Sequence, residues 1–146
     1  MVIIQQDNAR PHAKEDDATL ATELKKDGWK MKLLNQPANS PDYNALDLGF
    51  FNSIQSIQHQ KAPSNIDELI QVVQESYWEQ SAETVENVFI TVQKVMECSM
   101  IAEGSNKFKL PHMGKSKLRR QGQLQHILQV PEEVLFTAME KLQDAN

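Results

Sequence analysis

Residues 2–12 read Val-Ile-Ile-Gln-Gln-Asp-Asn-Ala-Arg-Pro-His and are the most informative part of the sequence for the fold. Its first residues are apolar and β-branched, which is typical of a short strand buried in a sheet. We therefore expect a strand over Val2–Gln6 that ends directly before Asp7. Pro11 has no backbone N–H to donate and prevents the strand from continuing. The sequence thus predicts a carboxylate at the carboxyl end of a buried strand.

A helix and a second strand follow closely. Asp16 or Asp17 can cap a helix that runs to about Asp27, with Gly28 as its C-terminal stop. Residues 30–34, Lys-Met-Lys-Leu-Leu, then alternate polar and apolar side chains, as a half-buried strand does. A strand, a helix and a strand within about 35 residues imply a right-handed crossover between parallel strands. The start of the chain therefore predicts an α/β fold.

A second block, residues 39–51, reads Asn-Ser-Pro-Asp-Tyr-Asn-Ala-Leu-Asp-Leu-Gly-Phe-Phe. The Ser-Pro-Asp sequence favours a turn, and an apolar helix after it would carry Asp47 in its first turn. Asp7 occupies the end of a strand, where open α/β sheets usually place their sites. If Asp7 and Asp47 converge, they can bind one divalent cation such as Mg²⁺ or Mn²⁺, which prefers oxygen ligands. That is the chemistry of phosphodiester cleavage and transfer.

The rest of the chain is expected to be rich in helices. Ser64 or Asn65 can cap one helix, Gly104 ends another, and Pro131 suits the first turn of a last helix over 132–144. Apolar side chains at three- and four-residue steps predict the buried faces. They are Leu46, Phe50, Ile54 and Ile57; Ile66, Leu69, Val73 and Trp78; Val85, Val88, Phe89, Val92, Val95, Met96, Ser99 and Met100; and Val134, Leu135, Ala138 and Leu142. The stripe over 85–100 could pack in a core or bind a partner.

Both acidic blocks resemble motifs of the mariner-like transposases, cut-and-paste DNA enzymes of the DDE/D superfamily. Residues 6–12, Gln-Asp-Asn-Ala-Arg-Pro-His, are similar to the second acidic motif of that family. Residues 40–47 are similar to its third motif, Ser-Pro-Asp-x-Asn-x-x-Asp/Glu, whose final acid is catalytic. The resemblance implies catalytic and metal-binding roles for Asp7 and Asp47. It also implies a partial ribonuclease H-like fold followed by several α-helices.

The last catalytic residue could be Asp47 or Asp42. Positions 8 to 46 leave 39 residues between Asp7 and Asp47, and Asp42 would leave 34; both spacings occur in the superfamily. We favour Asp47 because the local motif, and not the count, fixes the register. Asp42 is then a turn residue that bonds its own backbone.

Three neighbours of Asp7 are candidates for supporting roles. Asn8 could contact phosphate or the metal shell, although an asparagine after a strand often bonds backbone. Arg10 could contact DNA or brace a carboxylate. His12 could cap a helix or support the metal site.

The chain also departs from the family pattern. The family uses three carboxylates, the first on a strand well upstream, whereas the residues before Asp7 include no acid. The helix-turn-helix domain that reads transposon ends is also missing from this sequence. We therefore expect a truncated or degenerate copy, or a fragment, that is inactive alone. Its expected parts are a truncated catalytic domain over 1–103 and a basic tail with a C-terminal helix over 104–146.

The net charge of −5 disfavours nucleic acid as a partner, but the charges are unevenly distributed. Residues 104–131 contain no acidic side chain, and the remainder carries 9 basic and 20 acidic side chains, a balance of −11. This segment could bind DNA phosphates or could be a solvated linker. Its basic residues are Lys107, Lys109, Lys115, Lys117, Arg119 and Arg120.

Several expectations concern partners and location. The absence of the family's first strand would leave a sheet edge open, so a second copy could pair there as a homodimer. No segment approaches the ~18 consecutive apolar residues of a membrane helix, and no signal peptide is recognisable, so we expect no membrane partner and no secretion. The resemblance implies DNA as partner and the nucleus as location. The alternative is a non-catalytic interaction or DNA-binding module derived from a transposase.

Overall fold

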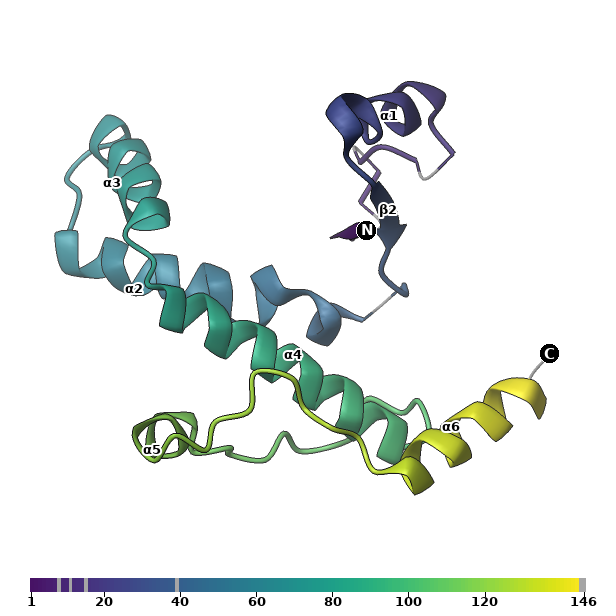
Figure 1. The fold of residues 1–146 in the computed structure, drawn as a ribbon. Coiled ribbons are helices and arrows are strands. Elements are labelled where there is room, and N and C mark those ends of the chain that lie inside the picture. Colours follow the sequence, from purple (N-terminus) through teal and green to yellow (C-terminus); the bar gives the residue numbers. More distant parts are fainter. Residues whose placement is uncertain (8, 11, 15, 39, 145–146) are drawn as a thin grey trace. The chain divides into compact units, whose positions relative to one another are not determined.

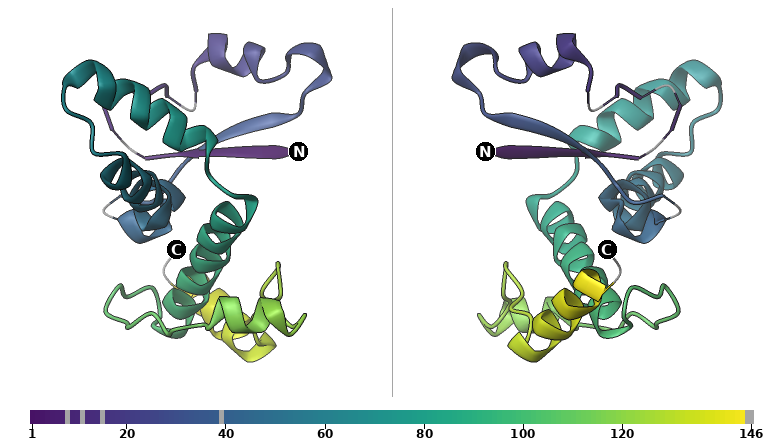
Figure 2. Two further views of the ribbon diagram at one scale, coloured as in Figure 1. Left: turned by 90° about the vertical axis from the view of Figure 1, so that its left-hand side faces the viewer. Right: turned by 90° about the vertical axis from the view of Figure 1, so that its right-hand side faces the viewer.

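The computed structural model describes residues 1–7, 9–10, 12–14, 16–38 and 40–144. Asn8, Pro11 and Asn39 of the two acidic blocks therefore lie outside the described residues. The chain forms two compact units, Met1–Asn44 and Ala45–Asn146 (Figure 1; Figure 2). Helices dominate, and one small parallel sheet accompanies them, so the structure belongs to a helix-rich α/β class.

The first unit is built around two parallel strands, β1 (Val2–Gln6) and β2 (Met31–Asn35), which pair along their whole length. The connection between them contains α1 (Ala18–Glu23) and a 3-10 turn, η1 (Lys26–Gly28). A second 3-10 turn, η2 (Pro41–Tyr43), follows β2. The expected first strand and its parallel pairing are confirmed, and the second strand begins one residue later than expected.

Helix α1 is shorter than the sequence suggests. Asp17 accepts a hydrogen bond from the backbone N–H of Leu20 at 2.9 Å, which confirms it as the cap. The helix nevertheless ends at Glu23, so the expectation that it continues to about Asp27 is wrong. The carbonyl of Leu24 accepts a hydrogen bond from the first residue of β2 at 3.2 Å. That bond ties the end of the helix to the sheet and replaces a further helical turn.

The expectation that β1 is a buried strand is also wrong in this structure. Val2, Ile3 and Ile4 are 46%, 55% and 40% exposed. The sheet has only two strands, so each strand has one edge without a strand partner among the described residues. Parallel strands with apolar side chains on both faces are normally covered on both faces. The conformation of β1 therefore agrees with its sequence, but its burial does not.

The second unit is helical throughout. It begins with η3, a π-helical turn in which the N–H of Phe51 bonds the carbonyl of Leu46, and η3 leads directly into α2. None of the helices in the described part of the chain is both long and apolar enough to span a membrane. The elements are η3 (Leu46–Phe50), α2 (Phe51–Lys61), α3 (Ile66–Trp78), α4 (Ala82–Ile101), α5 (Lys115–Arg120) and α6 (Glu132–Asp144).

The core of the second unit lies along α4. Its Val88, Ile90, Val92, Val95 and Ser99 are buried, so the helix contacts neighbours on more than one side. Helix η3 packs on one side, and α6 lies beside the C-terminal half (Figure 1; Figure 2). A single helical stripe does not describe this burial, because Ile90 lies outside the stripe expected from the sequence.

Several start and stop signals are confirmed. The side chain of Asn65 accepts the N–H of Glu68 at 2.9 Å and caps α3. Gly104 has a left-handed φ of 83° and donates its N–H to Ser99 at 2.9 Å, which ends the turn after α4. The last helix, α6, has the bounds expected for it.

The expected buried faces are correct only in part. Leu69, Val134 and Ala138 are half-buried, as are most of the residues expected to line the helix after Asp47. The buried and half-buried positions of the stripe over 85–100 are also as expected, whereas the other positions expected to be buried are exposed. The exposed side chains among them are Leu46, Ile66, Val73, Trp78, Phe89, Met96, Leu135 and Leu142.

Helix α5 was not expected from the sequence, and it lies within the segment that was expected to be a basic tail. Residues 104–146 belong to the same compact unit as 45–103. The expected division into a truncated catalytic domain over 1–103 and a basic tail over 104–146 stays a prediction.

Candidate functional site

Asp7 follows β1 directly, at the carboxyl end of the parallel pair. Its Oδ1 accepts the backbone N–H of Ala9 at 2.8 Å, and the Nδ1 atom of His12 lies 2.8 Å from the same oxygen. Both contacts are local, so the loop after β1 turns back on the carboxylate. The other oxygen, Oδ2, has no hydrogen-bond partner in the part of the chain that the structure describes. The loop that follows β1 thus holds Oδ1 of Asp7 in place.

The carboxyl ends of the strands are tied together beside Asp7. The Nε2 atom of Gln6 donates to Oδ1 of Asn35 at 2.8 Å and to the carbonyl of Ala13 at 2.5 Å. A pocket of about 600 Å³ opens at this edge. Its charged and polar lining comes from Gln6, Asp7 and Asn35 at the strand ends and from Arg10, His12, Lys14 and Asp16 in the loop.

The loop supplies a second carboxylate that the sequence analysis did not assign to the site. Asp16 lines the pocket with Asp7, whereas the sequence suggested only a capping role for it. Residues 8–16 carry no periodic pattern, so nothing in the sequence placed Asp16 near the strand end. Among the described residues, no three His, Cys, Asp or Glu side chains are grouped so that they could hold a metal ion.

Asp47 lies in the first turn of η3 and is exposed. Turn η2 precedes it, as the Ser-Pro-Asp sequence predicts, and Asp42 lies inside that turn. Gly49, two residues after Asp47, allows η3 to approach α4 closely, since a Cβ there would lie 3.1 Å from Cγ2 of Val88. Asp47 is therefore carried on a helix that packs against the core.

The two candidate ligands belong to different compact units, Asp7 to residues 1–44 and Asp47 to residues 45–146. Each has the local setting expected from the sequence, a strand end for one and a first helical turn for the other. Their convergence on one metal ion is a prediction that experiment has to test.

Two of the six basic candidates are used inside the protein. Arg119 donates from Nη1 to Oε1 of Glu83 at 2.7 Å and from Nη2 to Oε2 of Glu86 at 2.6 Å. The ammonium of Lys115 donates to the backbone carbonyl of Asn87 at 2.5 Å and also to the hydroxyl of Thr91. Arg119 and Lys115 thus fix α5 on α4.

Burial and neighbouring charges shift the pKa values at this contact. Burial, and then the positive charge of Arg119, lower the pKa of Lys115 below its usual range. The hydrogen bond from Arg119, followed by that from His126, lowers the pKa of Glu86. The carboxylate of Glu86 is accordingly held in its charged form between two donors.

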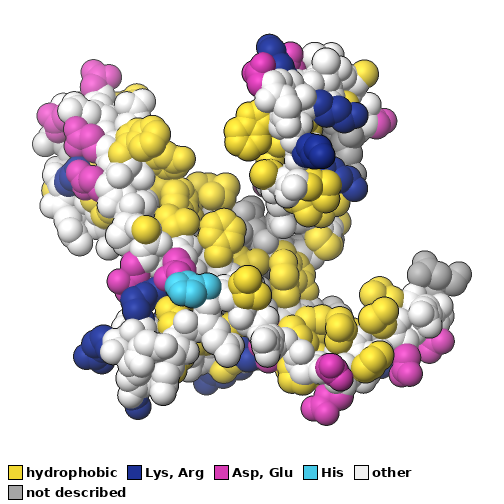
Figure 3. Space-filling view, viewed as in Figure 1, with side chains coloured by type: hydrophobic (Ala, Val, Ile, Leu, Met, Phe, Trp, Pro, Cys, Tyr) yellow, Lys and Arg dark blue, Asp and Glu magenta, His cyan; other side chains and the backbone are white. Residues whose placement is uncertain are grey.

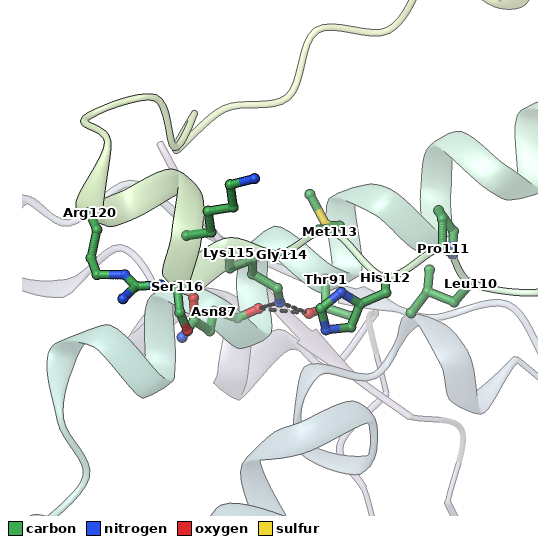
Figure 4. A pocket seen from close by; sticks show the side chains of 11 residues that line it. Asn87, Thr91, Leu110, Pro111, His112, Met113, Gly114, Lys115, Ser116 and Arg120 are labelled. Carbon is green, nitrogen blue, oxygen red and sulfur yellow. Dashed lines mark hydrogen bonds between the residues drawn. The ribbon is translucent and has the colours of Figure 1, made fainter.

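The other four basic candidates lie in different places. Lys117 and Arg120 line a groove of about 660 Å³, which we call the α5 groove, between Asn87 and Thr91 of α4 and residues 110–117 with Arg120 (Figure 4). Lys107 and Lys109 are exposed and do not line it. In Figure 3, lysine and arginine side chains gather around the α5 end of the visible face. The groove also contains His112 and Ser116, which the sequence analysis did not assign to a site.

Comparisons of this chain with protein-family models, with curated proteins and with solved structures find no match.

Proposed function

We propose that this chain carries part of the metal site of a DNA-cleaving and strand-transferring enzyme of the mariner-like transposase type. Asp7 and Asp47 are its carboxylate ligands for Mg²⁺ or Mn²⁺, and the α/β unit is part of a ribonuclease H-like fold. One observation carries the proposal: the carboxylate of Asp7 directly follows the first of two parallel strands and faces a pocket at their carboxyl ends.

The donor set suits a hard divalent cation. Carboxylate oxygens are the ligands that Mg²⁺ prefers, and it is usually held by one or two carboxylates together with water and substrate phosphates. The contacts with His12 and with the backbone N–H of Ala9 hold Oδ1 of Asp7 in place, and Asp7 lines the pocket in which a metal ion would bind. When bound, such ions activate the attacking oxygen and stabilise the leaving oxygen in phosphodiester chemistry.

The family pattern includes three carboxylates, and these 146 residues supply two at matching positions. We therefore expect negligible strand transfer by this chain alone in a metal-dependent plasmid-nicking assay. The nuclear location and the DNA partner belong to the same proposal.

Metal binding tests the proposal without requiring turnover. We expect Mg²⁺ or Mn²⁺ to raise the melting temperature, because a ligand that binds the folded state stabilises it. The Asp7→Asn and Asp47→Asn variants should each lose this shift, whereas Asp42→Asn should keep it. Loss in only one of the first two variants would show that the carboxylates do not share a metal ion, and no shift in the parent chain would exclude the site.

A second function is favoured by the exposed surfaces of the chain. A non-catalytic module that binds DNA or a protein partner would use the α5 groove or the apolar side chains left uncovered on β1 and on the helices. The open edge of β1 would then pair with a second copy. Light scattering during size-exclusion chromatography tests this pairing, since a monomer at all concentrations would rule out the homodimer.

A further inference from the structure

The α5 groove has two chemically different ends. Leu110 and Pro111 lie at one end, and Ser116 and Arg120 lie at the other, with Lys115 between them (Figure 4). At about 660 Å³ it lies within the size range of small-molecule sites. A ligand that fills it would carry an apolar part and a charged part.

The walls of the groove are held in place before any ligand arrives. Helix α4 forms one wall, and its Val88, Ile90 and Val92 belong to the buried core. The opposite wall is fixed by Lys115 and Arg119 through the bonds described above. These two cations therefore position α5 and are not the groups that would meet a ligand directly.

The charged end contains cations that have no anion beside them. Lys117 and Arg120 stand three residues apart on α5, so they are neighbours on the helix surface. Neither forms a hydrogen bond or an ion pair with any residue that the structure describes, and no carboxylate lines the groove. Both cations are therefore available to an anion from outside the chain.

We propose that the α5 groove binds one nucleotide unit of a DNA strand. The phosphate lies between Lys117 and Arg120 with Ser116 as a further donor, and the sugar and base pack against the apolar end. Arginine and lysine bind phosphate through charge-assisted hydrogen bonds, and protein pockets that take up a single base hold it between apolar or aromatic side chains. The inference rests on the second proposed function, DNA binding, and does not depend on Asp7 and Asp47.

A nucleotide fits these observations better than other anions. Inorganic phosphate would use only the charged end and would leave Leu110, Pro111 and Met113 without a role. An acidic peptide would match the charge with carboxylates, whereas a nucleotide carries its phosphate and the apolar faces of its base in one unit. Free nucleotide and a DNA strand share the same chemistry, so the experiment has to separate them.

The test compares two double variants with the same loss of charge. Lys117→Ala/Arg120→Ala removes the cations of the groove, and Lys107→Ala/Lys109→Ala removes two cations of the same tail outside it. Binding of a fluorescently labelled single-stranded oligonucleotide is measured by anisotropy at fixed ionic strength. We expect the groove variant to bind at least about tenfold more weakly and the control to change by less than about twofold. All four substituted residues are exposed, so their removal should not disturb the core, and circular dichroism should show that both variants are folded.

Three further arms make the outcome decisive. Unlabelled oligonucleotide should displace the probe more effectively than a deoxynucleoside monophosphate, and the monophosphate more effectively than inorganic phosphate; the reverse order would overturn the assignment of the apolar end. Equal losses in the two double variants would show diffuse attraction to the tail and overturn the groove. An Asp7→Asn/Asp47→Asn variant should bind the oligonucleotide as the parent does, so failure of the metal site is distinguishable from failure of the groove.

Discussion

The two compact units are stabilised in different ways. In residues 45–146, α4 buries five side chains, and ion pairs from Arg119 fix α5 to it. In the described residues of 1–44, only Leu33 and Gln36 are buried, and hydrogen bonds between strands and loops provide most of the connections. Both units form the elements that their sequences favour, but only the second has a core of its own. A strand's own sequence therefore decides its conformation, while its burial depends on what packs against it.

The largest effect expected from this comparison comes from one substitution made in each unit. Ile90 is 1% exposed and Ile3 is 55% exposed. Ile90→Ala should lower the free energy of unfolding by about 3 kcal/mol, because it removes buried methyl groups and leaves a cavity. Ile3→Ala should cost less than about 1 kcal/mol, because most of that side chain remains in water. Urea denaturation of each variant, followed by circular dichroism and by amide hydrogen exchange in β1, measures both.

The same pair of variants can break the comparison. If Ile3→Ala costs as much as Ile90→Ala, β1 is covered in solution. A cost that increases with protein concentration would identify the cover as a second copy of the chain, and a cost independent of concentration would place the cover within the chain itself.

A smaller effect is expected where η3 meets α4. A Cβ at Gly49 would lie 3.1 Å from Cγ2 of Val88, which is buried. Gly49→Ala should therefore lower stability by about 1 kcal/mol through overpacking. The double variant Gly49→Ala/Val88→Ala should lose less than the sum of the single variants, since the second change makes room for the first. Additive losses in thermal denaturation would show that η3 does not lie against α4.

The contact between α5 and α4 should respond differently to two neighbouring arginines. Arg119 bonds Glu83, Glu86 and Asn87, whereas Arg120 bonds none of the described residues. Arg119→Ala should lower the melting temperature slightly and increase amide exchange over 115–120. Arg120→Ala, which removes the same charge, should leave both unchanged. If both variants change stability and amide exchange equally, Arg119 does not hold α5 on α4 more than Arg120 does.

The smallest expected effect is a dependence of the same contact on pH. Hydrogen bonds from Arg119 and His126 lower the pKa of Glu86 from its ordinary 4.5. A carboxyl group with a lowered pKa stabilises the folded state above its ordinary pKa, and this contribution is lost as pH falls through the lowered value. Protection of α5 from amide exchange should therefore decrease at acid pH, below about 4.5. In Arg119→Ala, the loss of amide-exchange protection at acid pH should be smaller. A loss as large as in the parent chain would indicate that Glu86 does not hold α5.

Local signals in the sequence were sufficient for many features of the fold. The β-branched run before Asp7 located β1, and each of two helix starts was narrowed to two neighbouring residues, of which Asp17 and Asn65 are the caps. Asp47 was expected in a first helical turn, where it lies. Such features depend on neighbouring residues and can be read from a short window.

Features that depend on distant residues were missed. Helix α5 spans six residues and is fixed by bonds to α4 from Lys115 and Arg119, which lie 24 to 36 residues from their partners in the sequence. The position of Asp16 at the pocket beside Asp7 depends on the loop that folds back from β1. The positions on α3 and α6 that were expected to be buried follow a helical pattern, yet several of them are exposed. Periodicity identifies an apolar face but not its neighbour.

The proposed metal site can be tested by the broadening of amide NMR signals by Mn²⁺, whose paramagnetism affects nuclei close to the bound ion. If the carboxylates of Asp7 and Asp47 share a metal site, substoichiometric Mn²⁺ should broaden the signals around residue 7 and residue 47 together, and Asp7→Asn or Asp47→Asn should abolish both effects. Broadening around only one of the two residues, or the same pattern in the Asp7→Asn variant, would contradict the account.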